Sequence, residues 1–226
     1  ENAVLPEYTY LIVDEAHHLE EATTKQMSFD VSQDTIDQEL ALLAGSHSRS
    51  RQIGLIEQIA NTLITQLDPP ERRDMEGIAL SIASQAEDVG SAFRSLLNQL
   101  AGFVKESDSG DAEYGLRLRI TAGARKQPAW SRLEIAWDNV DARLKTLMQS
   151  VERARNFLRA VDEKMSLPDV DEMLRDINAR VDFWKKVQEE AGAILTNPKP
   201  NRVEWVEVPY RSEATAIHSA PLHVGE

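Results

Sequence analysis

The sequence predicts a mainly α-helical fold, an antiparallel bundle of long heptad-patterned helices with a small antiparallel β-element. Several long stretches place an apolar residue at alternating steps of three and four positions, which is typical of helices packed at shallow angles. Short polar turns separate these stretches, so neighbouring helices are expected to run antiparallel. Apolar and polar residues alternate at about 116–120 and again at 203–208, which predicts two paired strands.

The N-terminal part is expected to contain one strand followed by two short helices. Residues 8–13 are aromatic and β-branched, as in a buried strand. The apolar period then becomes helical over 16–27. A second helix is predicted after Ser32, where Ser32, Asp34 or Thr35 can cap the first turn.

Four apolar stripes predict the helices of the bundle. Pro69 and Pro70 end the first of them, and Pro70 can occupy the first turn of the next helix because its missing N–H has no partner there. The last stripe is interrupted at Gln188. In chain order the stripes are Ile53, Ile56, Ala60, Leu63 and Leu67; Met75, Ala79, Ile82, Ala86, Val89, Phe93, Leu96, Leu100 and Phe103; Trp130, Leu133, Trp137, Val140, Leu144, Leu147, Val151, Ala154, Leu158 and Val161; and Val170, Leu174, Ile177, Val181, Trp184, Ala191 and Leu195.

The two alternating segments are expected to pair with each other, because neither is stable alone in water. A shorter strand is expected at 216–218. Opposite charges on the solvent side of the pair would favour the pairing. The residues expected on that side are Arg117, Arg119, Glu204 and Glu207.

Composition limits the functional classes. The 226 residues include 38 Asp and Glu against 25 Lys and Arg, a formal net charge of -13, which disfavours a protein wrapped by nucleic acid but permits a local basic segment. The chain has no cysteine, so disulfides and zinc knuckles are excluded within it. No apolar run is long enough to cross a bilayer and no signal peptide is visible, so we expect a cytoplasmic protein with no membrane partner.

An acidic pair directly follows the first predicted strand, in the sequence Asp14-Glu15-Ala16-His17. Mg²⁺ prefers hard oxygen ligands and keeps several waters, so one well-placed aspartate at a strand end can hold it. The alternative is a helix N-terminus whose dipole favours acids. A zinc site at His17 and His18 is disfavoured, because adjacent histidines diverge on a helix and no His-Glu-x-x-His spacing occurs.

This motif resembles the Walker B, or DEAH, box of superfamily-two helicases. The segments 203–207 and 217–224 and the loop from Arg119 to Trp130 resemble the XPD/DinG family of DNA helicases. In that family a mainly helical insertion, the Arch domain, interrupts the motor between the DEAH box and the second motor domain.

The resemblance implies three parts: a remnant of the first motor domain at 1–20, a helical Arch-like domain at 21–208, and the start of the second motor domain at 209–226. Both ends of the chain are accordingly expected to be cut from a larger protein. The strands at 10–14 and 216–224 are then expected to lack the sheet to which they belong.

By the same resemblance, Asp14 is the magnesium ligand, Glu15 the water-activating acid and His17 the residue that couples nucleotide state to its neighbours, with Asp14 and Glu15 also contacting ATP. His18 departs from the family, in which asparagine is frequent. No Gly-x-x-x-x-Gly-Lys-Ser/Thr loop occurs in the chain, so the phosphates have no cradle. Mg²⁺ and ATP are therefore expected only in the parent protein, and the chain alone is not expected to hydrolyse ATP.

A local reversal of charge gives a candidate nucleic-acid contact. No acid occurs between positions 117 and 132, and Trp130 lies within this interval. Cations for phosphates and an aromatic ring for base stacking are typical of single-strand binding, and the resemblance implies that the Arch domain flanks the path of the translocating strand. Alternatively the arginines pair with acidic helices and Trp130 begins the core. The candidate cations are Arg117, Arg119, Arg125, Lys126 and Arg132.

Two functions of different classes follow. The first is an Arch-like module of an ATP-dependent DNA helicase, which helps to enclose and guide single-stranded DNA beside the remaining motor domains of its polypeptide. The second is a free-standing acidic bundle that binds a protein partner through an exposed apolar stripe, with a coincidental DEAH sequence.

Overall fold

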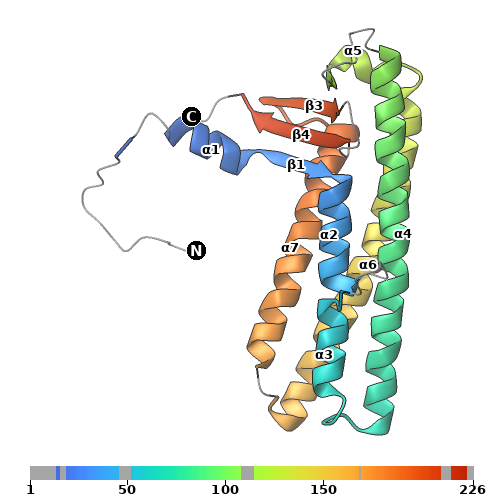
Figure 1. Ribbon diagram of the computed structural model, residues 1–226, viewed down its shortest axis with the longest axis vertical. Coiled ribbons are helices and arrows are strands. Elements are labelled where there is room, and N and C mark those ends of the chain that lie inside the picture. The colour runs from blue at the N-terminus through green and yellow to red at the C-terminus, as the bar shows by residue number, and fades with distance from the viewer. Residues whose placement is uncertain are drawn as a thin grey trace.

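A computed structural model of the chain describes residues 14–15, 19–45, 52–107, 115–167, 169–209 and 215–222. Long helices form a bundle, and a four-stranded antiparallel sheet lies at one end of it (Figure 1). The predicted mainly α fold with a small β-element is confirmed. The strand predicted at 8–13 lies outside the described residues.

Four columns of helix alternate in direction along the bundle (Figure 1). The first column consists of α2 (Gln33–Ala44) and α3 (Leu55–Leu63), which lead away from the sheet. Next come α4 (Pro69–Ser107) back towards it, α6 (Trp130–Met165) away from it and α7 (Val170–Leu195) towards it. At 1.5 Å per residue, α4 is about 58 Å long.

The heptad stripes form the core of this bundle. Every position predicted on α6 is buried, and on α4 only Ala79 among the predicted positions is less than fully buried. The first stripe was predicted less well. α3 begins after Ile53, whose exposed fraction is 44%, and Ile59 is buried where the stripe predicted Ala60, which is only partly buried. On α7 Val187 is buried beside the predicted interruption at Gln188.

Local hydrogen bonds define the helix ends. Ser32 caps α2 as predicted, since its hydroxyl accepts a hydrogen bond from the Thr35 backbone N–H at 3.3 Å. At the start of α4, the Asp68 carboxylate accepts from the Glu71 N–H at 3.0 Å. Glu71 also binds Lys164 Nζ at 2.8 Å, and this bond raises the pKa of Lys164. The ion pair joins the start of α4 to the end of α6.

The sheet contains two strands beyond the predicted pair, in the order β1-β4-β3-β2. The predicted pairing is confirmed, with Leu118 opposite Val206. β1 was missed, because only four residues alternate before α2 begins. The strands are β1 (Phe29–Ser32), β2 (Leu116–Arg119), β3 (Arg202–Val208) and β4 (Ala216–Pro221).

β4 lies in the interior of this sheet, with hydrogen-bonded neighbours on both sides. Ile217 on this strand is fully buried. The expectation that 216–224 lacks its sheet is therefore wrong for Ala216–Pro221. The segment is part of the same folded unit as the bundle.

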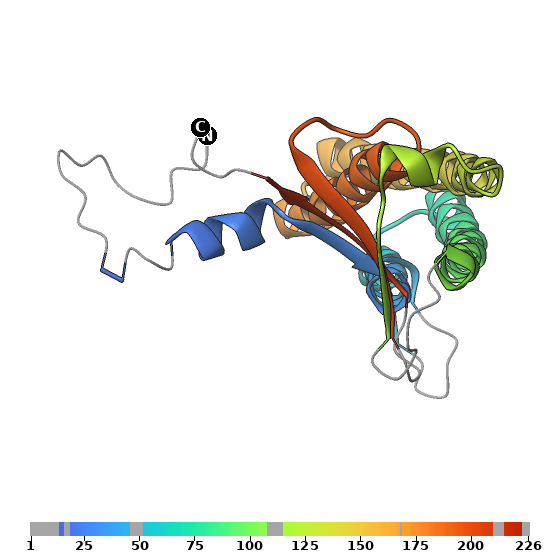
Figure 2. The same ribbon diagram turned by 90° about the horizontal axis from the view of Figure 1, so that it is seen from above.

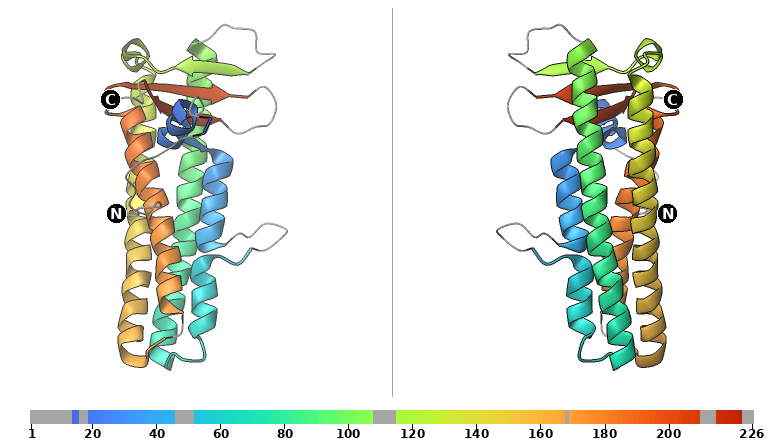
Figure 3. Two further views of the ribbon diagram at one scale, coloured as in Figure 1. Left: turned by 90° about the vertical axis from the view of Figure 1, so that its left-hand side faces the viewer. Right: turned by 90° about the vertical axis from the view of Figure 1, so that its right-hand side faces the viewer.

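The two faces of the sheet differ. One face contacts α4, and the other points away from the bundle (Figure 2). On that outer side α1 (Leu19–Met27) lies in front of β4 and β1, whereas no described helix covers β2 and β3 (Figure 3, left). Glu204 was predicted on the solvent side, but its exposed fraction is 5%, so it lies on the inner face with Val206 and Val208.

Although α4 and α6 are long, no helix among the described residues is both long enough and apolar enough to cross a membrane.

Candidate nucleic-acid interface

The acidic pair lies in an exposed turn before α1. The Glu15 backbone N–H donates to the Asp14 carboxylate at 2.9 Å. Glu15 has a φ of 51°, in the left-handed region. His17 lies outside the described residues, so its predicted coupling role stays a prediction.

The setting of Asp14 and Glu15 can be compared with their predicted roles at Mg²⁺ and ATP. Within the described part of the chain, no group of three or more histidine and acidic side chains could hold a metal ion. Both Asp14 and Glu15 are exposed, and the sequence contains no phosphate-binding loop. Their roles as magnesium ligand and water-activating acid stay predictions.

Arg125 points inward from the interval of candidate cations. It is the last residue of the short helix α5 (Ala122–Arg125), which Thr121 caps by accepting the Ala124 N–H at 3.2 Å. Its guanidinium forms an ion pair with Glu204 on the inner face of β3, and the exposed fractions of the two side chains are 16% and 5%. It also donates to the Ile194 carbonyl at 2.6 Å. We assign Arg125 a structural role, joining α5, β3 and the end of α7.

Trp130 belongs to the core, as the second alternative above predicts. Its exposed fraction is 1%, and its indole N–H donates to the Leu195 carbonyl at 3.1 Å. Phe103 contacts it edge-on at 5.3 Å between ring centroids. The Arg125 guanidinium lies 5.6 Å from its ring centroid. The ring is therefore not free to stack on a base.

Arg117 and Arg119 lie on the outer face of β2, where both are exposed. Arg117 pairs with Glu207 across the strands at 2.9 Å, as predicted. Arg119 lies opposite Trp205 rather than opposite an acid. Within the described part of the chain it has no ion pair, so its charge is available to a phosphate.

Lys126 and Arg132 are exposed, at the end of α5 and in the first turn of α6. The structure thus separates the five candidate cations into three settings: two on the outer sheet face, one turned into the fold, and two at the corner between α5 and α6. Four of the five remain accessible to an anionic ligand at the sheet end of the bundle.

Two residues on the outer face were not predicted as part of a site. Trp205 and His218 lie directly opposite each other on β3 and β4, and their rings stack with centroids 4.9 Å apart and planes 10° apart. Burial lowers the pKa of His218, against the raising effect of Glu207 and Asp30. The sequence signal was the alternation itself, which places Trp205 on the face opposite Val206. The pairing with His218 could not be read from it.

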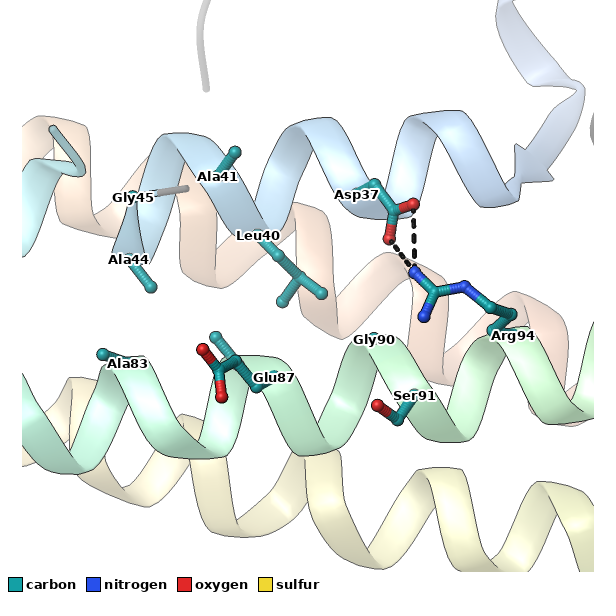
Figure 4. Close-up of a pocket in the computed structure, with 11 residues that line it drawn as sticks. Asp37, Leu40, Ala41, Ala44, Gly45, Ala83, Glu87, Gly90, Ser91 and Arg94 are labelled. Atoms are coloured by element: carbon teal, nitrogen blue, oxygen red, sulfur yellow. Dashed lines mark hydrogen bonds and ion pairs between the residues drawn. The ribbon is translucent and has the colours of Figure 1, made fainter. Parts of the chain in front are cut away.

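A groove of about 460 Å³ lies between α2 and α4 (Figure 4). Asp37 and Arg94 face each other across it at 3.5 Å. Its other lining residues are mostly small, and a Cβ added at Gly90 would lie 3.2 Å from Leu40 Cδ1, so the two helices approach closely there. Since the arginine among these described lining residues is ion-paired, the groove offers little to a phosphate.

Comparison with known proteins gives no assignment. No protein-family model matches the chain, and its sequence matches no curated protein.

Proposed function

We propose that this chain is the Arch-domain part of an ATP-dependent DNA helicase of the XPD/DinG type, and that it helps to enclose and guide single-stranded DNA. The main support is the position of the two segments that resemble motor sequences. β1, which follows the DEAH-like segment, pairs with β4, and Phe29 lies opposite Ser219. The polypeptide therefore enters and leaves the bundle on adjacent strands.

This arrangement is what an inserted domain requires. A module placed between two segments of another domain must begin and end close together, as the termini of independently folding units often do. The bundle extends downward from the sheet in Figure 1, whereas α1 lies beside the sheet at the left of the view. Such a geometry suits a rigid helical extension anchored to a motor by its sheet end.

The catalytic parts of the proposal belong to the parent protein. Asp14 would contribute a magnesium ligand, Glu15 would orient or deprotonate water, and His17 would relay nucleotide state. Mg²⁺ supplies charge stabilisation of the phosphates when it is bound. This chain alone is then expected to show no ATP hydrolysis.

The coding sequence immediately upstream tests the class of protein. A Gly-x-x-x-x-Gly-Lys-Ser/Thr loop in the same reading frame is expected. The polypeptide that includes it should hydrolyse ATP in the presence of single-stranded DNA, and Glu15→Gln should abolish that hydrolysis. An upstream sequence without any phosphate-binding loop would contradict the proposal.

Binding of DNA by the present chain tests the interface. We expect weak binding of a fluorescein-labelled oligo(dT), measured by anisotropy and strongly weakened by salt. Arg119→Ala removes one phosphate contact, so the slope of log affinity against log salt should decrease by about 0.7. Arg159→Ala is the matched control, because this exposed arginine lies near the far end of α6. Affinity that does not respond to salt would contradict the electrostatic account.

The free-standing interaction module receives less support. It requires a continuous exposed apolar stripe on a helix. Among the described residues, the large exposed apolar side chains are scattered along the chain, and the two on α6 lie near opposite ends of that helix. They are Met27, Ile53, Ile64, Leu80, Ile135, Met165 and Leu222. Scattered apolar residues of this kind are normal on a protein surface.

A further inference from the structure

The outer face of the sheet carries a row of four side chains that crosses all four strands. Arg119 lies opposite Trp205, Trp205 opposite His218, and His218 opposite Asp30. The row runs from a cation on the edge strand β2, through two aromatic rings, to an acid on the edge strand β1. No described helix covers its β2 and β3 portion (Figure 3, left).

Trp205 differs from the other three tryptophans. Trp130, Trp137 and Trp184 have exposed fractions of 1% to 4% and belong to the core, whereas Trp205 is half-buried on an open face. Its ring is fixed by the parallel stack on His218. A flat indole held in this way is suited to stacking against another planar π-system.

Polar ring atoms of the stacked Trp205 and His218 also lack hydrogen-bond partners among the described residues. Trp205 Nε1 and His218 Nε2 are shielded from solvent, and neither has a hydrogen-bond partner among the described residues. His218 Nε2 lies 3.6 Å from a carboxylate oxygen of Glu207, beyond hydrogen-bond distance. Shielded polar groups without a partner are costly, and a bound molecule that adjusts the stack could supply one.

Charge favours a nucleic acid as the occupant and sets its position. Arg119 is exposed on the Trp205 side of the row and has no ion pair within the described part of the chain. The Arg117 cation neutralises Glu207. Asp30 is exposed at the opposite end, beyond His218, and would repel a phosphate. A polyanion is therefore directed to β2 and β3 rather than to β4 and β1.

We propose that a base of single-stranded DNA stacks on Trp205 on the open face of the sheet, with a flanking phosphate held by Arg119. This inference rests on the proposed function, because it names where the guided strand contacts the module. It adds an aromatic contact for the strand in place of Trp130, whose ring lies in the core.

Photo-crosslinking tests the contact without changing the protein. The unmodified chain is irradiated with oligo(dT) in which some thymines are replaced by 5-iodouracil, a base that crosslinks to aromatic rings in contact with it. Digestion with trypsin after Arg202 and Arg211 gives the peptide 203–211, which contains Trp205. We expect the crosslink on this peptide, at Trp205. A crosslink confined to other peptides would overturn the proposal, because it would show that the DNA contacts a different surface of the chain.

Variants separate stacking from phosphate binding. Trp205→Leu should weaken oligo(dT) binding about 5- to 150-fold, while leaving the salt dependence of the remaining affinity unchanged. Trp205→Phe should retain most of the affinity, because it keeps a ring. Arg119→Ala should instead lower the salt slope by about 0.7. Circular dichroism and urea midpoints verify that each variant folds.

The outcomes distinguish the two proposals. Salt-dependent binding that Arg119→Ala weakens but Trp205→Leu does not would overturn the stacking contact and leave the helicase assignment standing. If the wild-type chain binds no single-stranded DNA and its parent has no phosphate-binding loop, both proposals fail.

Discussion

Replacing Arg125 with alanine should lower the free energy of unfolding by about 3–5 kcal/mol, because it leaves the Glu204 carboxylate buried without its cation. The exposed fraction of the Glu204 side chain is 5%, so water cannot readily replace the guanidinium. The Ile194 carbonyl loses a donor at 2.6 Å as well. The loss should therefore fall in the upper part of the range for single substitutions.

Urea denaturation, followed by tryptophan fluorescence and circular dichroism, measures this free energy. The matched control is Arg117→Ala, since Arg117 belongs to the same basic interval but its ion pair with Glu207 is exposed, with side-chain fractions of 65% and 40%. Such surface pairs contribute about 0–1 kcal/mol. Both variants remove the cation of an ion pair, so the difference between them measures the burial of the Arg125 pair together with its hydrogen bond to the Ile194 carbonyl.

A second variant tests the reasoning about desolvation. Arg125→Met/Glu204→Leu replaces the pair with apolar groups, and buried ion pairs replaced in this way often retain or gain stability. The double variant should therefore be more stable than Arg125→Ala. A loss below about 1 kcal/mol in Arg125→Ala would refute the structural role, and would return Arg125 to the candidate phosphate contacts.

Four further outcomes are expected. Removing 209–226 should cost more than the about 2–5 kcal/mol of a single buried aliphatic side chain, because it removes interior strand β4; an unchanged thermal transition by circular dichroism would contradict this. Because the pKa of His218 is lower in the folded state than in the unfolded state, its neutral form stabilises the fold above a pH of about 6.5. This stabilisation should be lost as the pH falls towards the folded-state pKa. His218→Gln should therefore reduce the difference between the urea midpoints at pH 8 and pH 5. Gly77→Ala on α4 should stabilise by about 0.5–1 kcal/mol, since an added Cβ meets nothing within 4 Å. Gly192→Val should destabilise by about 1–3 kcal/mol, since its Cβ would lie 3.3 Å from Trp137; equal midpoints for the two glycine variants would show that the Trp137 contact is not limiting.

The sequence alone determined the helical bundle, because the heptad signal is local. An apolar residue every three or four positions fixes which side of a helix is buried, whatever the partner helix is. The stripe on α6 from Trp130 to Val161 is buried at every predicted position for this reason. The pairing of β2 with β3 was also predictable, since both strands alternate clearly.

Tertiary structure alone decided the composition of the sheet and the position of each charge. Which strands become neighbours depends on how the bundle brings their ends together, so β4 could not be placed between β1 and β3 from its own residues. Likewise, alternation shows that Glu204 and Trp205 face opposite sides but not which side is covered. The packing of α4 and α7 against one face buried Glu204, drew Arg125 inward to pair with it, and left Trp205 beside His218 on the open side.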